Sequence, residues 1–194
     1  MKKMKTDRRV RRTQNALKTN LLLLMKEQPI QKISVSRLCE KSDINRSTFY
    51  TYYSSPMDLL HSIEDEILQK LEESIFQYQQ ENSLPLFQFL HSIVHYISSH
   101  QNLIRLIFSD NGDPGFLNQL TLTLQEKTIK NWKTRFPSCS EESLITLLTF
   151  ISRGCIGVIE LWIRNDFQAS EEEISHTLEI LSRSAASAVL EIRL

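Results

Sequence analysis

The sequence has few of the residues that loop-rich folds depend on, with 4 Gly and 5 Pro among 194 residues. Sandwiches, barrels and α/β sheets need many turns, so this composition argues against them. The 3 cysteines, Cys39, Cys139 and Cys155, are odd in number and show no CxxC spacing. We therefore expect neither a disulfide framework nor a cysteine-based zinc site, and a reducing cytoplasm is the expected compartment.

Patterns of membrane proteins, secreted proteins and common enzymes are also missing. The longest aliphatic run, Leu21 to Met25, is far shorter than the roughly 18–20 residues that span a bilayer, so no membrane partner is expected. No signal peptide follows the basic N-terminus, although a mitochondrial presequence over residues 1–12 is an alternative interpretation. No GxSxG, HExxH, phosphate-binding glycine loop or dinucleotide fingerprint occurs, so we expect no enzyme and no cofactor.

The formal net charge of zero conceals two oppositely charged parts. Residues 1–60 carry 13 Lys and Arg against 5 Asp and Glu, whereas residues 61–194 carry 10 against 18. A basic head on an acidic body indicates a polyanionic partner for the head alone. In the acidic part, Glu64-Asp65-Glu66 and Glu171-Glu172-Glu173 are interpreted as solvated helix faces or helix-start charges.

Helical periodicity runs through almost the whole chain and predicts an all-α protein of about nine helices. Starts are marked by Ser34, Asn45, Ser55-Pro56 and the capping box at Ser170, whose side chains can accept the free amide hydrogens of a first turn. The helices are expected at about 7–27, 34–41, 46–53, 56–81, 85–100, 103–108, 116–136, 141–165 and from 171 onward.

Residues 34–53 form two short capped helices joined by a three-residue turn, the layout of a helix-turn-helix. Val35 and Leu38 would anchor the first helix and Phe49 the second, and Tyr53 would pack in the small core. The second helix has polar residues at its N-terminal end, where it would enter the major groove. The residues expected to contact DNA are Ser34, Ser36, Arg37, Asn45, Arg46, Ser47, Thr48, Tyr50 and Tyr52, with Arg11 and Arg12 of the basic arm.

These side chains have distinct expected roles. Arg46 could donate two hydrogen bonds to guanine O6 and N7, and Thr48 could contact a thymine methyl group or a phosphate. Hydroxyl groups of Tyr50 and Tyr52 would position the helix by binding phosphates without reading sequence. The arm would add salt-sensitive affinity.

Four stretches in one register resemble the tetracycline-repressor (TetR) family of transcription regulators. They are Arg12-Thr13-x-x-Ala16-Leu17, Ile33-Ser34-Val35-x-x-Leu38-Cys39, the run from Asp43 to Tyr53, and Asp58-Leu59-Leu60. The resemblance implies a three-helix DNA-binding head (residues 1–55), a larger helical ligand-binding and dimerisation body (residues 56–194), and a homodimer on a palindromic operator. Asp43, Tyr53 and Pro56 replace the family's usual Gly, Phe and phosphate-contacting Lys.

The body contains a candidate dimer surface and a candidate pocket. Its last two long helices carry apolar seams and small residues that favour close helix packing, as in the family's dimerising four-helix bundle; an intramolecular core is the alternative. The expected dimer residues are Leu148, Ile151, Gly154, Cys155, Val158, Trp162, Leu181, Ala185 and Ala188. By the resemblance, His95, Tyr96 and Trp132 are candidates for an inducer pocket. His91 and His95 share a helix face, but nothing nearby completes a ligand set, so no metal site is expected.

The sequence thus favours a sequence-specific DNA-binding regulator, with double-stranded DNA, a second copy of the chain and a small-molecule inducer as partners. Repression relieved by the inducer is the expected outcome. A TetR-like regulator or activator controlled by a protein partner is the first alternative. An enzyme with a composite site is the second.

Overall fold

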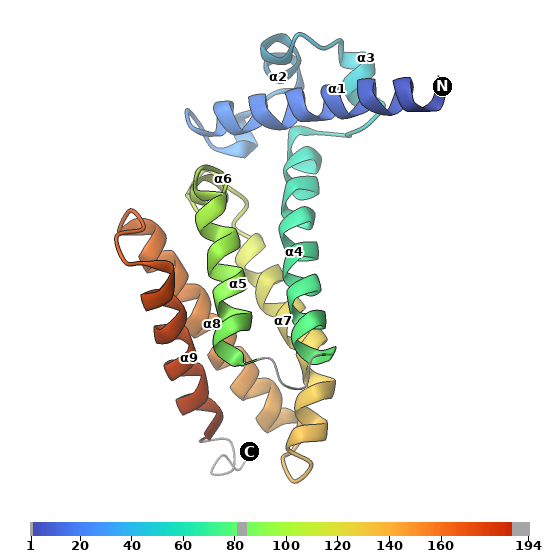
Figure 1. Cartoon of the computed structure of the whole chain (residues 1–194). Coiled ribbons are helices and arrows are strands. Elements are labelled where there is room, and N and C mark those ends of the chain that lie inside the picture. The colour runs from blue at the N-terminus through green and yellow to red at the C-terminus, as the bar shows by residue number, and fades with distance from the viewer. Residues whose placement is uncertain (1, 81–84, 188–194) are drawn as a thin grey trace. The chain divides into compact units, whose positions relative to one another are not determined.

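The computed structural model describes residues 2–80 and 85–187, with side chains from residue 8 onward. These ranges contain nine α-helices, one short 3-10 helix and no strand, so the all-α prediction is confirmed. The elements are α1 (Lys2–Met25), η1 (Ile30–Lys32), α2 (Val35–Ser42), α3 (Arg46–Tyr50), α4 (Pro56–Gln80), α5 (Leu86–Ser99), α6 (Gln101–Ile107), α7 (Phe116–Arg135), α8 (Glu141–Arg164) and α9 (Glu171–Ser187) (Figure 1).

The chain forms two compact units, which we call the head unit and the body unit. The head unit comprises Met1–Ile67 and Asn102–Pro114, and the body unit comprises Leu68–Gln101 and Gly115–Leu194. The head unit is therefore larger than the basic segment of residues 1–55, because it also takes in the first half of α4 and most of α6. The functional division between residues 55 and 56 stays a prediction.

The head unit is built around an apolar core that α1, α2, α3 and α4 share. The buried side chains include Leu17, Leu21, Leu24, Leu38, Phe49, Leu59, Leu60 and Ile63. Burying an aliphatic side chain of this size stabilises a fold by roughly 1.5–3 kcal/mol, so these contacts hold the short helices in place.

α3 is shorter than the sequence predicts. It ends at Tyr50 because the amides of Tyr52 and Tyr53 both donate to the carbonyl oxygen of Phe49, which tightens the chain into a turn. The next helix begins as expected, since Ser55 Oγ accepts a hydrogen bond from the amide of Asp58 at 3.1 Å.

The turn after α6 is tied to the end of α1 within the head unit. Asn111 Nδ2 donates to the carbonyl oxygen of Met25 at 2.8 Å, and the Asn111 carbonyl accepts from the amide of Ile30 at 3.0 Å. Gly112 lies so close to α6 that a Cβ atom here would stand 2.3 Å from the carbonyl oxygen of Ile107. The turn therefore requires glycine for steric reasons.

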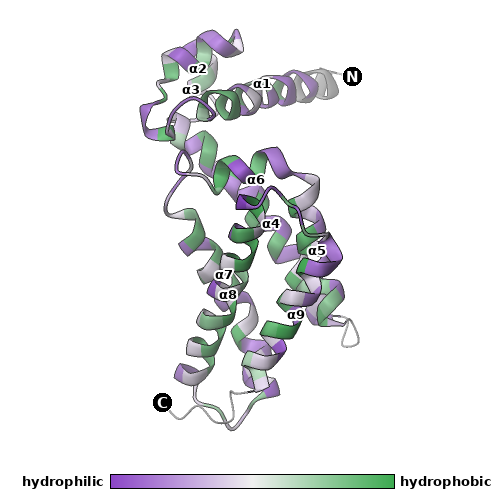
Figure 2. Ribbon diagram, turned by 90° about the vertical axis from the view of Figure 1, so that its left-hand side faces the viewer, coloured by the Kyte–Doolittle hydropathy of each residue, from purple (hydrophilic) through white to green (hydrophobic). Residues whose placement is uncertain are grey.

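In the body unit, α5 packs against α9, and α8 packs against both α7 and α9. Leu144 and Leu147 of α8 form a buried cluster with half-buried Ile129, Trp132 and Phe136 of the α7 region. Hydrophilic and hydrophobic residues alternate along these helices, as amphipathic packing requires (Figure 2).

α8 corrects the expectation that no segment is apolar enough to cross a membrane. Among the described residues it is the one helix that meets the length and composition for a membrane span, although only 28% of its apolar window is buried. A core helix of a soluble protein meets the same test. α8 is apolar on two faces, because one face contributes residues to the body core and the other forms an outward-facing stripe described below.

Candidate nucleic-acid interface

The N-terminal turn of α3 is capped and polar. Asn45 Oδ1 accepts a hydrogen bond from the amide of Ser47 at 3.0 Å, so the predicted cap is present. Asn45, Arg46 and Ser47 are exposed and Thr48 is half-exposed, whereas Phe49 is fully buried. The buried ring fixes the rotation of the helix, so its polar end faces solvent.

The turn between α2 and α3 adopts the left-handed conformation at Asp43, with φ 53° and ψ 45°. Its amide donates toward the carbonyls of Cys39 and Glu40, which closes the end of α2. Asp tolerates this conformation better than most residues, so the replacement of the family's Gly leaves the helix-turn-helix intact.

The tyrosines after Phe49 have different environments. Tyr53 is buried, and its ring centroid lies 6.0 Å from that of Phe49, so the core position predicted for Tyr53 is confirmed. Tyr50 packs edge-on against Phe49 at 5.5 Å and remains 59% exposed. Tyr52 is half-buried. Tyr50 therefore presents the larger surface to a ligand.

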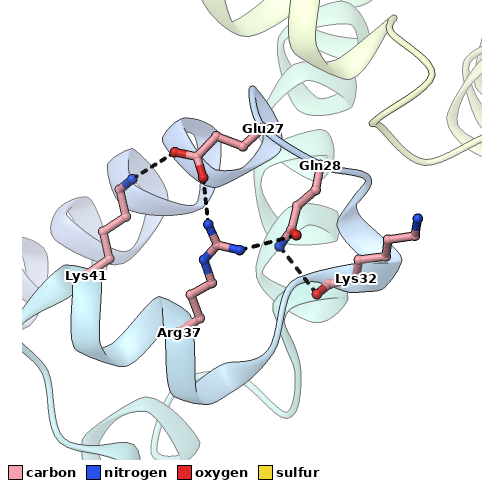
Figure 3. Close-up of polar contacts among 5 residues, drawn as sticks. All are labelled: Glu27, Gln28, Lys32, Arg37 and Lys41. Carbon is pink, nitrogen blue, oxygen red and sulfur yellow. Dashed lines mark hydrogen bonds and ion pairs between the residues drawn. The ribbon is translucent and has the colours of Figure 1, made fainter.

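Arg37 is held by two residues of the turn that follows α1, and its side chain stays about half exposed (Figure 3). Its Nη2 atom lies 2.7 Å from Glu27 Oε2, and its Nη1 atom donates to Gln28 Oε1 at 3.3 Å. Glu27 also pairs with Lys41 at 3.4 Å. This network fastens α2 to the end of α1, and a phosphate contact by Arg37 would have to compete with Glu27.

The other predicted DNA contacts lie on α1 and at the start of α2. Ser34 Oγ accepts from the amide of Arg37 at 3.3 Å, which confirms the cap and leaves the hydroxyl hydrogen to donate elsewhere. Ser36 is half-buried. Arg11 and Arg12 are exposed on α1. The side chains of the arm before residue 8 lie outside the described residues.

The outward face of α8 carries an apolar stripe with small residues at its centre. Phe150, Gly154, Gly157 and Leu161 follow one another at spacings of four, three and four, which places them on one helix face. Phe150 is 69% exposed and Leu161 is 59% exposed. A Cβ atom at either glycine would meet nothing within 4 Å. We call this surface the outer stripe.

The predicted dimer residues divide between this surface and the core. Gly154 lies on the outer stripe, and Leu181 is exposed on α9 beside exposed Ile180. Leu148 and Trp162 are buried in the protomer and have little surface to offer a partner; Trp162 Nε1 donates to the carbonyl oxygen of Ala169 at 2.8 Å. Half-buried positions are Ile151, Cys155, Val158 and Ala185, and Ala188 lies outside the described residues.

The three pocket candidates have separate contacts among the described residues. His95 Nδ1 lies 3.0 Å from Glu171 Oε2 in an exposed ion pair. Tyr96 stacks on His100 with ring centroids 4.4 Å apart, and Trp132 packs against the Leu144 cluster. A groove of about 320 Å³ lies elsewhere in the body unit and is lined by Gln69, Glu72, Glu73, Ile75, Phe76, Gln79 and Lys127. The inducer pocket stays a prediction.

Comparison with known proteins identifies the family. A family model described as the C-terminal region of a transcriptional regulator, of TetR type, matches residues 85–184, just over half of the chain. The chain belongs to the TetR family of transcriptional regulators. No curated protein matches this TetR-family chain in sequence.

Solved structures agree with this TetR-family fold at low sequence identity. A TetR regulator from Streptococcus agalactiae superposes with a TM-score of 0.67 at 21% identity, over 92% of this chain and 98% of that one. The dihydroxyacetone kinase operon activator DhaS superposes with a TM-score of 0.59 at 16% identity, over 94% of this chain and 98% of that one. RolR in complex with resorcinol superposes with a TM-score of 0.53 at 15% identity, over 94% of this chain and 95% of that one.

One unusual residue of this TetR-family regulator is Glu64, which the charge pattern of the sequence assigned to a solvated face. That interpretation is wrong, because Glu64 is only 1% exposed and neither of its carboxylate oxygens has a hydrogen-bond partner among the described residues. Burial, together with the negative charges of Asp113 and Asp65, raises the pKa of Glu64 to about 8. Its position four residues after Leu60, on the apolar face of α4, was the signal that pointed to burial.

Proposed function

We propose that this TetR-family regulator binds a specific palindromic operator in the cytoplasm and represses transcription until a small-molecule inducer releases it. The observation that carries the proposal is the capped end of α3, where Asn45, Arg46 and Ser47 face solvent above the buried Phe49. A helix presented in this way can place its N-terminal side chains against base edges in the major groove.

Each group has the chemistry for one part of recognition. The guanidinium of Arg46 matches the paired acceptors of guanine, and the hydroxyl and methyl groups of Thr48 suit a phosphate or a thymine. Tyr50 is exposed enough to donate its hydroxyl to a phosphate, which fixes the register of the helix on DNA. Exposed Arg11 and Arg12 supply positive charge that attracts the duplex and makes binding salt-dependent.

The outer stripe supports the second part of the proposal, a homodimer. Exposed Phe150 and Leu161 flank two glycines that allow the backbone of another helix to approach closely. Ile180 and Leu181 add exposed apolar surface on α9. A twofold dimer would deliver two copies of α3 to half-sites roughly 34–36 Å apart, which explains why a palindrome is expected.

Activation of transcription is the alternative outcome. The structural likeness to DhaS, which is an operon activator, supports this alternative. Control by a protein partner rather than a small molecule is a further alternative, for a repressor as well as for an activator. RolR, solved with resorcinol, is the relative that favours a small aromatic effector. A reporter gene behind the operator separates the outcomes, because deleting the regulator raises expression under repression and lowers it under activation.

Selection of bound fragments from a random DNA pool tests operator binding. We expect enrichment of one inverted repeat whose half-sites are about one helical turn apart. If no sequence is enriched even at low salt, where phosphate contacts are strongest, the proposal is wrong.

Arg46→Ala tests the role assigned to α3. We expect operator binding to weaken by roughly 1–3 kcal/mol and one base position in each half-site to become degenerate, because one bidentate contact is lost. Arg135→Ala removes the same charge from an exposed position on α7 and should leave binding unchanged. Fluorescence anisotropy on the selected operator measures both, and unaltered affinity in Arg46→Ala would exclude the proposed contact.

Gly154→Leu combined with Gly157→Leu tests the dimer surface. The protomer should fold normally, since a Cβ at either position meets nothing within 4 Å, whereas a close helix contact should be blocked. Sedimentation velocity should show monomer for this variant and dimer for Thr134→Leu, which places the same side chain at an exposed site on α7. A dimer that survives both glycine substitutions would place the interface elsewhere.

A further inference from the structure

Three potential metal ligands come together in the head unit. His61 and Glu64 lie one turn apart on α4, and Asp113 follows α6 in the turn that is tied to α1. Their nitrogen and oxygen atoms all lie within 4.8 Å of one another, and His61 Nε2 is 3.3 Å from Asp113 Oδ2. Two ligands about 2.0–2.1 Å from a tetrahedral metal are separated by roughly 3.4 Å, so the His61–Asp113 spacing already suits coordination.

Glu64 supplies the independent sign that this cluster binds something. It is only 1% exposed and its carboxylate lies beside His61 and Asp113, yet neither oxygen accepts or donates a hydrogen bond within the described residues. A buried carboxyl group without a partner destabilises a fold, and most such groups are satisfied by a hydrogen bond, an opposite charge or a metal ion. A cation beside Glu64 would remove this penalty and balance the charge of Asp113.

The chemistry of the ligands narrows the choice of cation. One imidazole nitrogen and two carboxylate oxygens suit zinc and similar first-row metals, whereas magnesium and calcium prefer oxygen ligands alone. We propose that His61, Glu64 and Asp113 bind a divalent first-row transition-metal ion, with solvent completing the coordination shell. The half-exposed His61 side chain gives the ion a route from solvent.

Neighbouring contacts hold the ligands in position. Asn111 bonds to Met25 and Ile30, and the close packing of Gly112 on α6 fixes the backbone just before Asp113. His61 and Glu64 are on a helix whose flanking apolar residues are buried. A bound ion would therefore join α4 to a turn that is already fastened to α1, and it should stabilise the head unit.

The experiment is a zinc titration of the chelator-treated full-length protein, followed by competition with a fluorescent zinc indicator. We expect one zinc ion per chain, bound at a site that excess magnesium does not displace. His61→Ala should weaken binding by more than the roughly 10–100-fold typical of changes to residues that only support a ligand, because it removes a direct ligand. Glu64→Gln, which keeps the shape of the side chain, should have a similar effect.

His176→Ala is the matched control. His176 also lies beside a carboxylate, with Nδ1 3.7 Å from Glu179 Oε2, but on α9 in the body unit. Its replacement should leave zinc affinity unchanged. Absence of stoichiometric zinc binding, or equal affinity in His61→Ala, Glu64→Gln and the unaltered protein, would overturn the proposal. Ready displacement by magnesium would overturn the assigned metal class. None of these measurements uses DNA, so they are independent of operator binding.

Discussion

Replacing Glu64 by Gln should flatten the pH dependence of folding stability in the metal-free protein. The pKa of Glu64 is about 8 in the folded chain, compared with an ordinary value of 4.5. Burial is the main cause, and the nearby charges of Asp113 and Asp65 add to it. Between these two pH values the folded state keeps a proton that the unfolded state has lost, so the free energy of unfolding must fall as pH rises.

The expected size follows from the same shift. Each pH unit between the two pKa values lowers the free energy of unfolding by about 1.4 kcal/mol, so the full shift would give an upper limit of about 5 kcal/mol. Solvent beside the half-exposed His61 screens the site, so we expect about 2–3 kcal/mol. The loss should be absent below roughly pH 4.5 and complete above roughly pH 8.

Urea unfolding followed by circular dichroism, in the presence of a chelator, measures this effect. Glu64→Gln should match the unaltered protein near the acid end of the range and exceed it in stability near the alkaline end, because the amide cannot ionise. Glu126→Gln makes the same chemical change at an exposed site on α7 and should keep the original slope. Parallel stability curves for Glu64→Gln and the unaltered protein would refute the assignment of a buried, protonated carboxyl group.

Three further substitutions test local packing and helix capping. Gly112→Ala should destabilise the protein by about 1–3 kcal/mol, since the new Cβ would lie 2.3 Å from the Ile107 carbonyl oxygen; Gly157→Ala, with open space around it, should be neutral or stabilising by up to about 1 kcal/mol. Equal melting temperatures for these two variants would contradict the contact at Gly112. Ser140→Ala should cost about 1 kcal/mol, because Ser140 Oγ accepts the amide of Ser143 at 3.0 Å to cap α8; an unchanged unfolding midpoint would show that this cap contributes nothing.

Local features of the fold were predictable from the sequence. Ser34, Asn45 and Ser55 cap α2, α3 and α4 as expected, because a capping side chain bonds to an amide only two or three residues away. The same holds for the burial of Phe49 and Tyr53, since helical periodicity and the short turn determine which side faces the core. The helix-turn-helix and the family it implies therefore follow from short-range sequence patterns alone.

Long-range contacts decided the rest. Glu64 looks like one acid in a charged run, and it is buried because α4 packs its apolar face inward and the turn at Asp113 closes over the same site. Arg37 looks like a free phosphate ligand, but Glu27 in the turn after α1 pairs with it. On α8, the residues of the outer stripe and the buried core residues both recur at spacings of three and four. Only the packing of α8 against α7 and α9 therefore decides which of these residues are buried. Sequence specifies interactions within a few residues, whereas partners brought together from distant parts of the chain depend on the folded structure.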